Sequence, residues 1–302
     1  MDDAVALDLP SEEPSIARLP VCANCGTERP GKFCSHCGQK HRTPHDLRLR
    51  SFFQHVIEEF TSVDSKIFRS LKSLLFYPGK LTAEWIAGRE RSYVKPIQLF
   101  LVVNLFYWLL LHFSQVTTFT TPLNVQYNME GYSGLIRPIV DEQVKSSGVP
   151  YRLFEKSYNE ASASQARSLI ILMVPIFAGM LALLYVRSRR YFVEHLIFSL
   201  HFYAFFLILV SVGVLLIELI IDLIAAKFHL DLKGPDWESI FTYIPGAIAF
   251  AYLLFALRRV YKDSWLATSL RAVVLTYSIL LILTLYRFLL FFSTIYTMRA
   301  IV

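Results

Sequence analysis

The sequence has few charged residues and lacks the common nucleotide-binding motifs. Only 18% of the 302 residues are charged and 54% are hydrophobic. This balance excludes an ordinary soluble domain of this length and fits a multi-pass membrane protein. The phosphate-binding motifs G-x-x-x-x-G-K-[ST] and G-x-G-x-x-G are absent, so nothing in the sequence points to nucleotide use. The hydrolase motif G-x-S-x-G is absent as well.

The first twenty residues lack the basic start and the apolar core of a signal peptide. They carry five acidic residues instead, which are Asp2, Asp3, Asp8, Glu12 and Glu13. Residues 1–19 are therefore predicted to be a short, disordered acidic tail.

Cysteine is confined to one short segment. The four cysteines have the spacing C-x2-C-x8-C-x2-C and are Cys22, Cys25, Cys34 and Cys37. Two C-x2-C turns can present four thiolates to one tetrahedral ion, so residues 20–45 are predicted to be a ribbon that holds a structural zinc ion. The alternative is two disulfides, which would need an oxidising compartment. A closed four-thiolate site either stabilises a small segment or supports the recognition of a cytoplasmic partner.

Residues 46–96 are predicted to form amphipathic helices beside the membrane. The first covers Leu49–Phe60 and the second covers Asp64–Phe76. In the second, one apolar stripe faces a basic side; the stripe comprises Ile67, Phe68, Leu71, Leu74 and Leu75, and the basic side comprises Lys66, Arg69 and Lys72. This pattern is typical of a helix in the headgroup plane. The alternative is that the helices pack on each other or on the membrane bundle.

Residues 97–302 are predicted to be an all-α transmembrane bundle. Five apolar runs reach the length needed to cross a bilayer, at about residues 97–113, 169–186, 196–222, 240–257 and 272–292. A polar outer loop, 114–168, separates the first two runs, and part of it is compatible with a helix.

Basic residues predict the orientation of this bundle. They gather before the first run, after the second and after the fourth, as Lys80, Arg89, Arg91, Lys95, Arg187, Arg189, Arg190, Arg258, Arg259, Lys262 and Arg271. Five crossings would place these segments on one side. The positive-inside rule then puts the N-terminus in the cytoplasm and the C-terminus outside.

Several segments resemble a family of bacterial inner-membrane proteins of unknown function. They include the two cysteine turns (C-x2-C-G and F-C-x2-C-G-Q), Asp64–Leu81, Gly88–Pro96 and Glu194–His201. The resemblance implies a zinc ribbon joined to a multi-pass bundle in the inner membrane, and it implies no activity.

Ionisable residues within the predicted spans form two groups. The first, Glu194, His195 and His201, lies at the cytoplasmic end of the third span. No two of these residues have the i, i+4 spacing that lets one helix present two metal ligands. We therefore expect Glu194 to pair with Arg187, Arg190, Arg258 or Arg259, and the histidine rings to bond with backbone or lipid headgroups.

The second group comprises Glu218 and Asp222 of the third span and Arg287 of the fifth. Because both spans run outward, an ion pair between an acid and Arg287 would reduce the cost of burying these charges. A structural clamp is the favoured interpretation, and a proton or anion relay is the alternative.

The leading functional interpretation is non-enzymatic. The sequence favours a membrane-embedded adaptor or lipid-associated component, with membrane lipids and a cytoplasmic protein as partners and without nucleic acid. A small transporter that uses spans three and five is the first alternative. An enzyme acting on a lipid-linked substrate through Glu194, His195 and His201 is the weaker one.

Overall fold

The computed structural model describes residues 20–28, 30–40, 66–114, 119–128, 131–228 and 236–299. Within these ranges the secondary structure is helical, apart from turns, irregular connections and two isolated β-bridges in the cysteine segment. The helices are α2 (Lys66–Phe76), α3 (Lys80–Ile86), α4 (Pro96–Ser114), α5 (Leu123–Asn128), α6 (Ser133–Ser147), α7 (Tyr151–Leu169), η2 (Ile170–Leu172), α8 (Met173–Leu184), α9 (Phe192–Phe228), α10 (Asp236–Tyr261) and α11 (Trp265–Arg299). The predicted tail 1–19 and the predicted helix Leu49–Phe60 lie outside the described residues.

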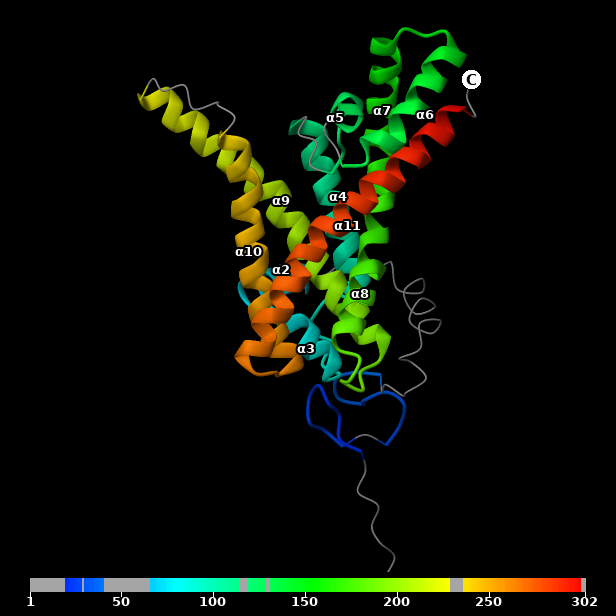
Figure 1. Ribbon diagram of the computed structural model, residues 1–302. Coiled ribbons are helices and arrows are strands. Elements are labelled where there is room, and N and C mark those ends of the chain that lie inside the picture. The colour runs from blue at the N-terminus through cyan, green and yellow to red at the C-terminus, as the bar shows by residue number, and fades with distance from the viewer. Residues whose placement is uncertain are drawn as a thin grey trace, which may run out of the picture.

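The long helices run between two ends of the molecule (Figure 1). The cysteine segment lies at one end, beside α3 and the connections α8–α9 and α10–α11; this end is called the base. Helices α6 and α7 and the C-terminal half of α11 lie at the other end. Helix α9 packs on α4, α8 and α10, while α11 packs on α10, α7 and α8. The three basic segments seen in the sequence therefore meet at the base.

Among the described residues, three helices are long and apolar enough to cross a membrane, which is the pattern of an integral membrane protein. The segments are Phe192–Gly213 in α9, Ile244–Tyr261 in α10 and Trp265–Met298 in α11. The outer faces of α10 and α11 expose large apolar side chains, among them Phe255 and Leu281. Such faces require an apolar environment or a partner.

The predicted count of five spans is not confirmed. Tyr151–Ala166 and Ile170–Leu184 would make a fourth span only if this pair, bent by 53°, crosses as one unit. The apolar part of α4, Pro96–Leu110, is a shorter helix. The break lies directly before η2, where the α-helical hydrogen-bond pattern tightens for three residues.

The predicted loop 114–168 contains three helices, α5, α6 and α7. They form a second apolar core against α11, in which Ile136, Val140, Tyr158 and Phe291 are fully buried. Ile136 and Val140 are four residues apart in α6 and share a face. The polar composition of the segment hides this narrow stripe.

Helix α2 covers only part of its predicted apolar stripe. Ser70 and Ser73, with Leu74, are buried, whereas Phe68 is 81% exposed. The amide of Val94 donates a 2.9 Å hydrogen bond to Oγ of Ser70. Small hydroxyl side chains let α2 approach the chain closely, and this contact selects the face that is covered. The opposite face carries Phe68, Lys72 and Phe76 at i, i+4 and i+8, called the α2 ridge.

Candidate metal centre and the base of the bundle

Two turns of the same construction bring the four cysteines together. In each, the amide of the following glycine donates to the carbonyl of the first cysteine, over 2.9 Å from Gly26 to Cys22 and 2.7 Å from Gly38 to Cys34. Both glycines have positive φ, 76° and 68°, a conformation that glycine adopts with little steric cost. The turns therefore present their sulfurs to one point.

The sulfur positions fit a tetrahedral metal site. The Sγ atoms of Cys22 and Cys37 are 3.7 Å apart, and those of Cys25 and Cys34 are 3.6 Å apart. All four lie within 4.8 Å of one another, and the cysteines are free thiols. A tetrahedral ion with metal–sulfur distances of about 2.3 Å would need sulfurs about 3.8 Å apart. The four cysteines could therefore hold a metal ion.

The thiols affect one another's protonation. Hydrogen bonding with Thr27 lowers the pKa of the Cys25 thiol to about 5. A bond with the backbone of Gln39 acts to lower the pKa of Cys37, but burial and the sulfurs of Cys25 and Cys22 raise it to about 11. Four thiolates therefore repel one another at this distance. A dication would relieve that repulsion, because metals bind the deprotonated thiol.

The ribbon contacts the base of the bundle through its two turns. A Cβ on Gly38 would overlap with the guanidinium of Arg91, and a Cβ on Gly88 would lie 3.4 Å from Cβ of Ala23. The connection between α3 and α4, residues 87–95, therefore supports the ribbon. On the ribbon itself, Val21 is 61% exposed and Phe33 is 62% exposed.

Behind the ribbon, charged side chains tie the helix ends together. Nη1 of Arg190 lies 2.7 Å from a carboxylate oxygen of Glu194, and its Nη2 donates over 2.7 Å to the carbonyl oxygen of Val260. Arg190 is one of the four partners considered for Glu194. This single side chain connects the start of α9 with the end of α10.

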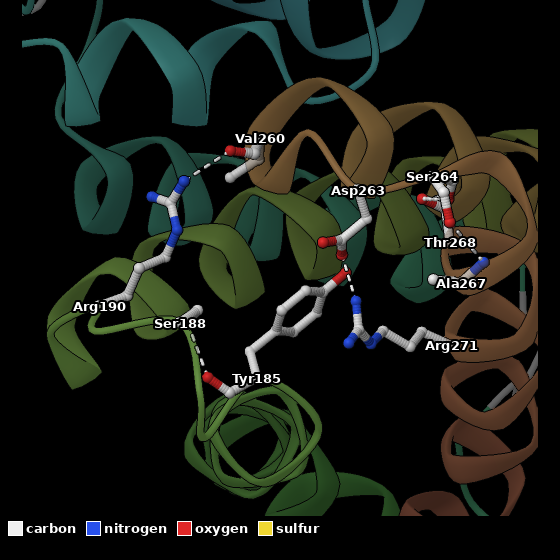
Figure 2. Close-up of polar contacts among 9 residues, drawn as sticks. All are labelled: Tyr185, Ser188, Arg190, Val260, Asp263, Ser264, Ala267, Thr268 and Arg271. Atoms are coloured by element: carbon white, nitrogen blue, oxygen red, sulfur yellow. Dashed lines mark hydrogen bonds and ion pairs between the residues drawn. The ribbon is translucent and has the colours of Figure 1, made fainter.

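Two tyrosine rings stack at this end of the bundle, and Figure 2 shows one of them, Tyr185, near Asp263 and Arg271. The rings of Tyr185 and Tyr261 lie 3.7 Å apart with an interplanar angle of 15°. The guanidinium of Arg271 lies 4.4 Å from the Tyr185 ring, and that of Arg190 lies 5.0 Å from the Tyr261 ring. Arg271 also pairs with Asp263. Cations over aromatic faces are stabilising, so the stack connects α8, α9, α10 and α11.

Both histidines bond to hydroxyl groups of other helices. Nδ1 of His195 lies 2.7 Å from the hydroxyl of Tyr261, and Nδ1 of His201 lies 2.9 Å from the hydroxyl of Thr82 in α3. At Nδ1 of both rings, the partner is a side-chain hydroxyl and not the backbone or a headgroup. The partners are 66 and 119 residues away in sequence, so local spacing gave no sign of them.

The described part of the bundle shows no second metal site. Among the described residues, the cysteine quartet is the group of histidine, cysteine and acidic side chains close enough to share an ion. Glu194, His195 and His201 are each engaged with a different partner. The side chains of Glu218 and Asp222 lie outside the described residues, so their pairing with Arg287 stays a prediction.

Replacing Tyr261 with phenylalanine should destabilise the base slightly. The variant keeps the stacked ring but leaves Nδ1 of His195 without its hydroxyl partner, a loss of about 1 kcal/mol. We expect a lower midpoint of thermal unfolding in detergent. Tyr277→Phe, at a 70% exposed position of α11, is the control and should leave the midpoint unchanged. Equal midpoints for both variants would contradict a role for the Tyr261 hydroxyl.

Comparison with known proteins identifies one family model. A family described as a protein of unknown function (DUF3667) matches residues 64–108, which include α2, α3, the connection 87–95 and most of α4. No curated protein and no solved structure matches the chain. The matched stretch is thus similar to a family without an assigned activity, and it is the part of the chain that supports the ribbon.

Proposed function

We propose that this protein is a non-enzymatic adaptor of the bacterial inner membrane that presents a zinc ribbon to a cytoplasmic protein. The main support for this proposal is the contact between the ribbon and the base of the bundle. Its turns contact Gly88 and Arg91 at the base, while Val21 and Phe33 stay exposed. Two exposed apolar side chains on a small ribbon offer a contact surface to a partner protein.

Zinc is the proposed ion, because four thiolates in a closed tetrahedral site are its usual structural ligands. The ion would hold the two turns together and would supply no open position for a substrate. In the proposed topology, five crossings through α4, the α7–α8 pair, α9, α10 and α11 place the ribbon in the cytoplasm and the end of α11 outside. The basic segments that meet at the base support this orientation.

The α2 ridge supports lipid contact at the cytoplasmic face. Phe68 and Phe76 are 81% and 72% exposed and flank Lys72 on one face of the helix. Aromatic side chains beside a cation suit the boundary between acyl chains and anionic headgroups. The ridge thus fits a helix that rests on the membrane while its serine face packs on the protein.

Site-specific photo-crosslinking tests the adaptor proposal. A photoreactive residue at position 33 should form an adduct with another protein in intact cells. The same residue at Leu135 of α6, which is 63% exposed, is the matched control and should form none. The adduct at position 33 should disappear when Cys34→Ser disrupts the ribbon. Absence of protein adducts at both 21 and 33 would contradict the proposal.

A further inference from the structure

A small pocket lies where the support of the ribbon meets α9. It is lined by residues of α3, of the connection that follows it, of the start of α4 and of α9, namely Leu81, Trp85, Arg89, Glu90, Tyr93, Val94, Lys95, Pro96 and His201. The pocket is open on one side and has room for about one water molecule. A single oxygen of a larger group could enter it while the rest of that group stays at the mouth.

His201 gives this pocket a buried polar wall. The residue is only 5% exposed, and its Nδ1 is already engaged by the hydroxyl of Thr82. A neutral imidazole has two ring nitrogens, so Nε2 is the nitrogen that a ligand in the pocket would meet. Buried polar atoms favour ligands that satisfy them.

Arginine and aromatic side chains shape the mouth. Arg89 binds Glu84 through Nε and Nη2, over 2.7 and 2.9 Å, so the pair fixes the guanidinium while the N–H groups of Nη1 are not used by Glu84. Lys95 adds a second positive charge, and Trp85 and Tyr93 provide apolar walls. A held guanidinium beside aromatic rings suits a phosphate attached to an apolar or glycerol-like body.

We propose that this pocket binds the phosphate group of a phospholipid headgroup. One phosphate oxygen enters toward Nε2 of His201, and Arg89 and Lys95 hold the others. The position supports this ligand: Pro96 begins the apolar helix α4, and the exposed aromatic side chains of the α2 ridge lie on the helix directly before α3.

Most of the pocket lies in the stretch that the family model matches. Eight of the nine lining residues, all except His201, fall within residues 64–108, the stretch that the family model matches. The pocket therefore belongs to the part of the chain shared with that family. The inference goes beyond the adaptor proposal and does not depend on it, because it concerns the pocket and not the ribbon.

Fluorescence titration of the full-length protein in detergent tests the proposal. Trp85 lines the pocket, so its emission should change when a short-chain phosphatidylglycerol binds, and Trp85→Phe should lose this signal. Three probes separate the sources of the phosphate: the short-chain phospholipid, a diacylglycerol with the same chains and no phosphate, and inorganic phosphate. We expect tight binding of the phospholipid and none of the diacylglycerol.

Glutamine substitutions inside and outside the pocket show where the phospholipid binds. Arg89→Gln and His201→Gln should each weaken binding about tenfold or more, as expected for the loss of a hydrogen bond to a charged group. Arg91→Gln removes the same charge from the same connection but does not line the pocket, and it should change affinity less than twofold. If the His201→Gln variant does not fold, the affinity of the Arg89→Gln variant, changed at the exposed rim, is sufficient to test the proposal.

Each outcome is informative. Inorganic phosphate binding as tightly as the phospholipid, with the same loss in Arg89→Gln, would support the phosphate site and make soluble phosphate its source. Three results would overturn the proposal: no phosphate-dependent signal, equal binding of the diacylglycerol, or an equal loss of affinity in Arg91→Gln. The last would mean that diffuse positive charge, rather than the pocket, attracts the ligand.

Discussion

Replacing Cys34 with serine should reduce the metal content of the purified protein from one ion per chain to none. Cys34 is only 2% exposed, and its sulfur lies 3.6 Å from that of Cys25. A serine hydroxyl is a poor ligand for zinc, a borderline-soft ion that prefers thiolates. Since small ribbons owe about 10–16 kcal/mol of folding energy to the metal, the ribbon should unfold together with its loss.

Metal analysis by mass spectrometry measures this effect, and the chain offers a matched control. His36 lies between Cys34 and Cys37 but does not belong to the group that could share an ion. His36→Ala should therefore keep the metal. Full metal content in Cys34→Ser would contradict the four-thiolate site. A wild-type mass about 4 Da below the reduced value would instead reveal two disulfides.

Replacing Gly79 with alanine should strongly destabilise the contact between the α2–α3 hairpin and α10. Gly79 has φ 72°, and a Cβ there would lie 2.7 Å from the carbonyl oxygen and 2.8 Å from Cα of Ala256. Backbone atoms cannot rotate away, so α3 must shift. We expect a loss of about 2–4 kcal/mol, from the left-handed conformation and the overlap together.

Thermal unfolding in detergent tests the Gly79 prediction. The shift of α3 should also weaken the bond between Thr82 and His201 and the contact of Arg259 with the carbonyl of Pro78, which is 2.6 Å long. Gly179→Ala in α8 is the control, because a Cβ there would meet nothing within 4 Å. Equal unfolding midpoints for the two variants would show that the hairpin does not pack on α10 as described.

The cysteine cluster was predictable because its information is local. Two C-x2-C turns with following glycines define their own geometry, and the structure places the four sulfurs within reach of one ion. The length of the apolar runs similarly predicted the membrane-spanning helices α9, α10 and α11. For α4 and the α7–α8 pair it was less decisive, because one is short and the other is bent by 53°.

Contacts between distant segments were not predictable from the sequence. Helical spacing in α2 found an apolar stripe, but the covered face was selected by Ser70 and its bond with Val94. His201 and Thr82 carry no mutual signal in the sequence. Part of 114–168 was compatible with a helix, but its apolar core was missed because buried positions such as Ile136 and Val140 are few among polar residues.

Hydrogen–deuterium exchange of the full-length protein, with its metal and after chelation, tests the central claim that a metal ribbon is mounted on the membrane bundle. Our account predicts that removing the metal speeds exchange in the ribbon and in residues 87–93, where Gly88 and Arg91 contact it. Helix α6, at the opposite end, should be unaffected. Unchanged exchange in residues 87–93, with faster exchange confined to the ribbon, would contradict the mounted arrangement.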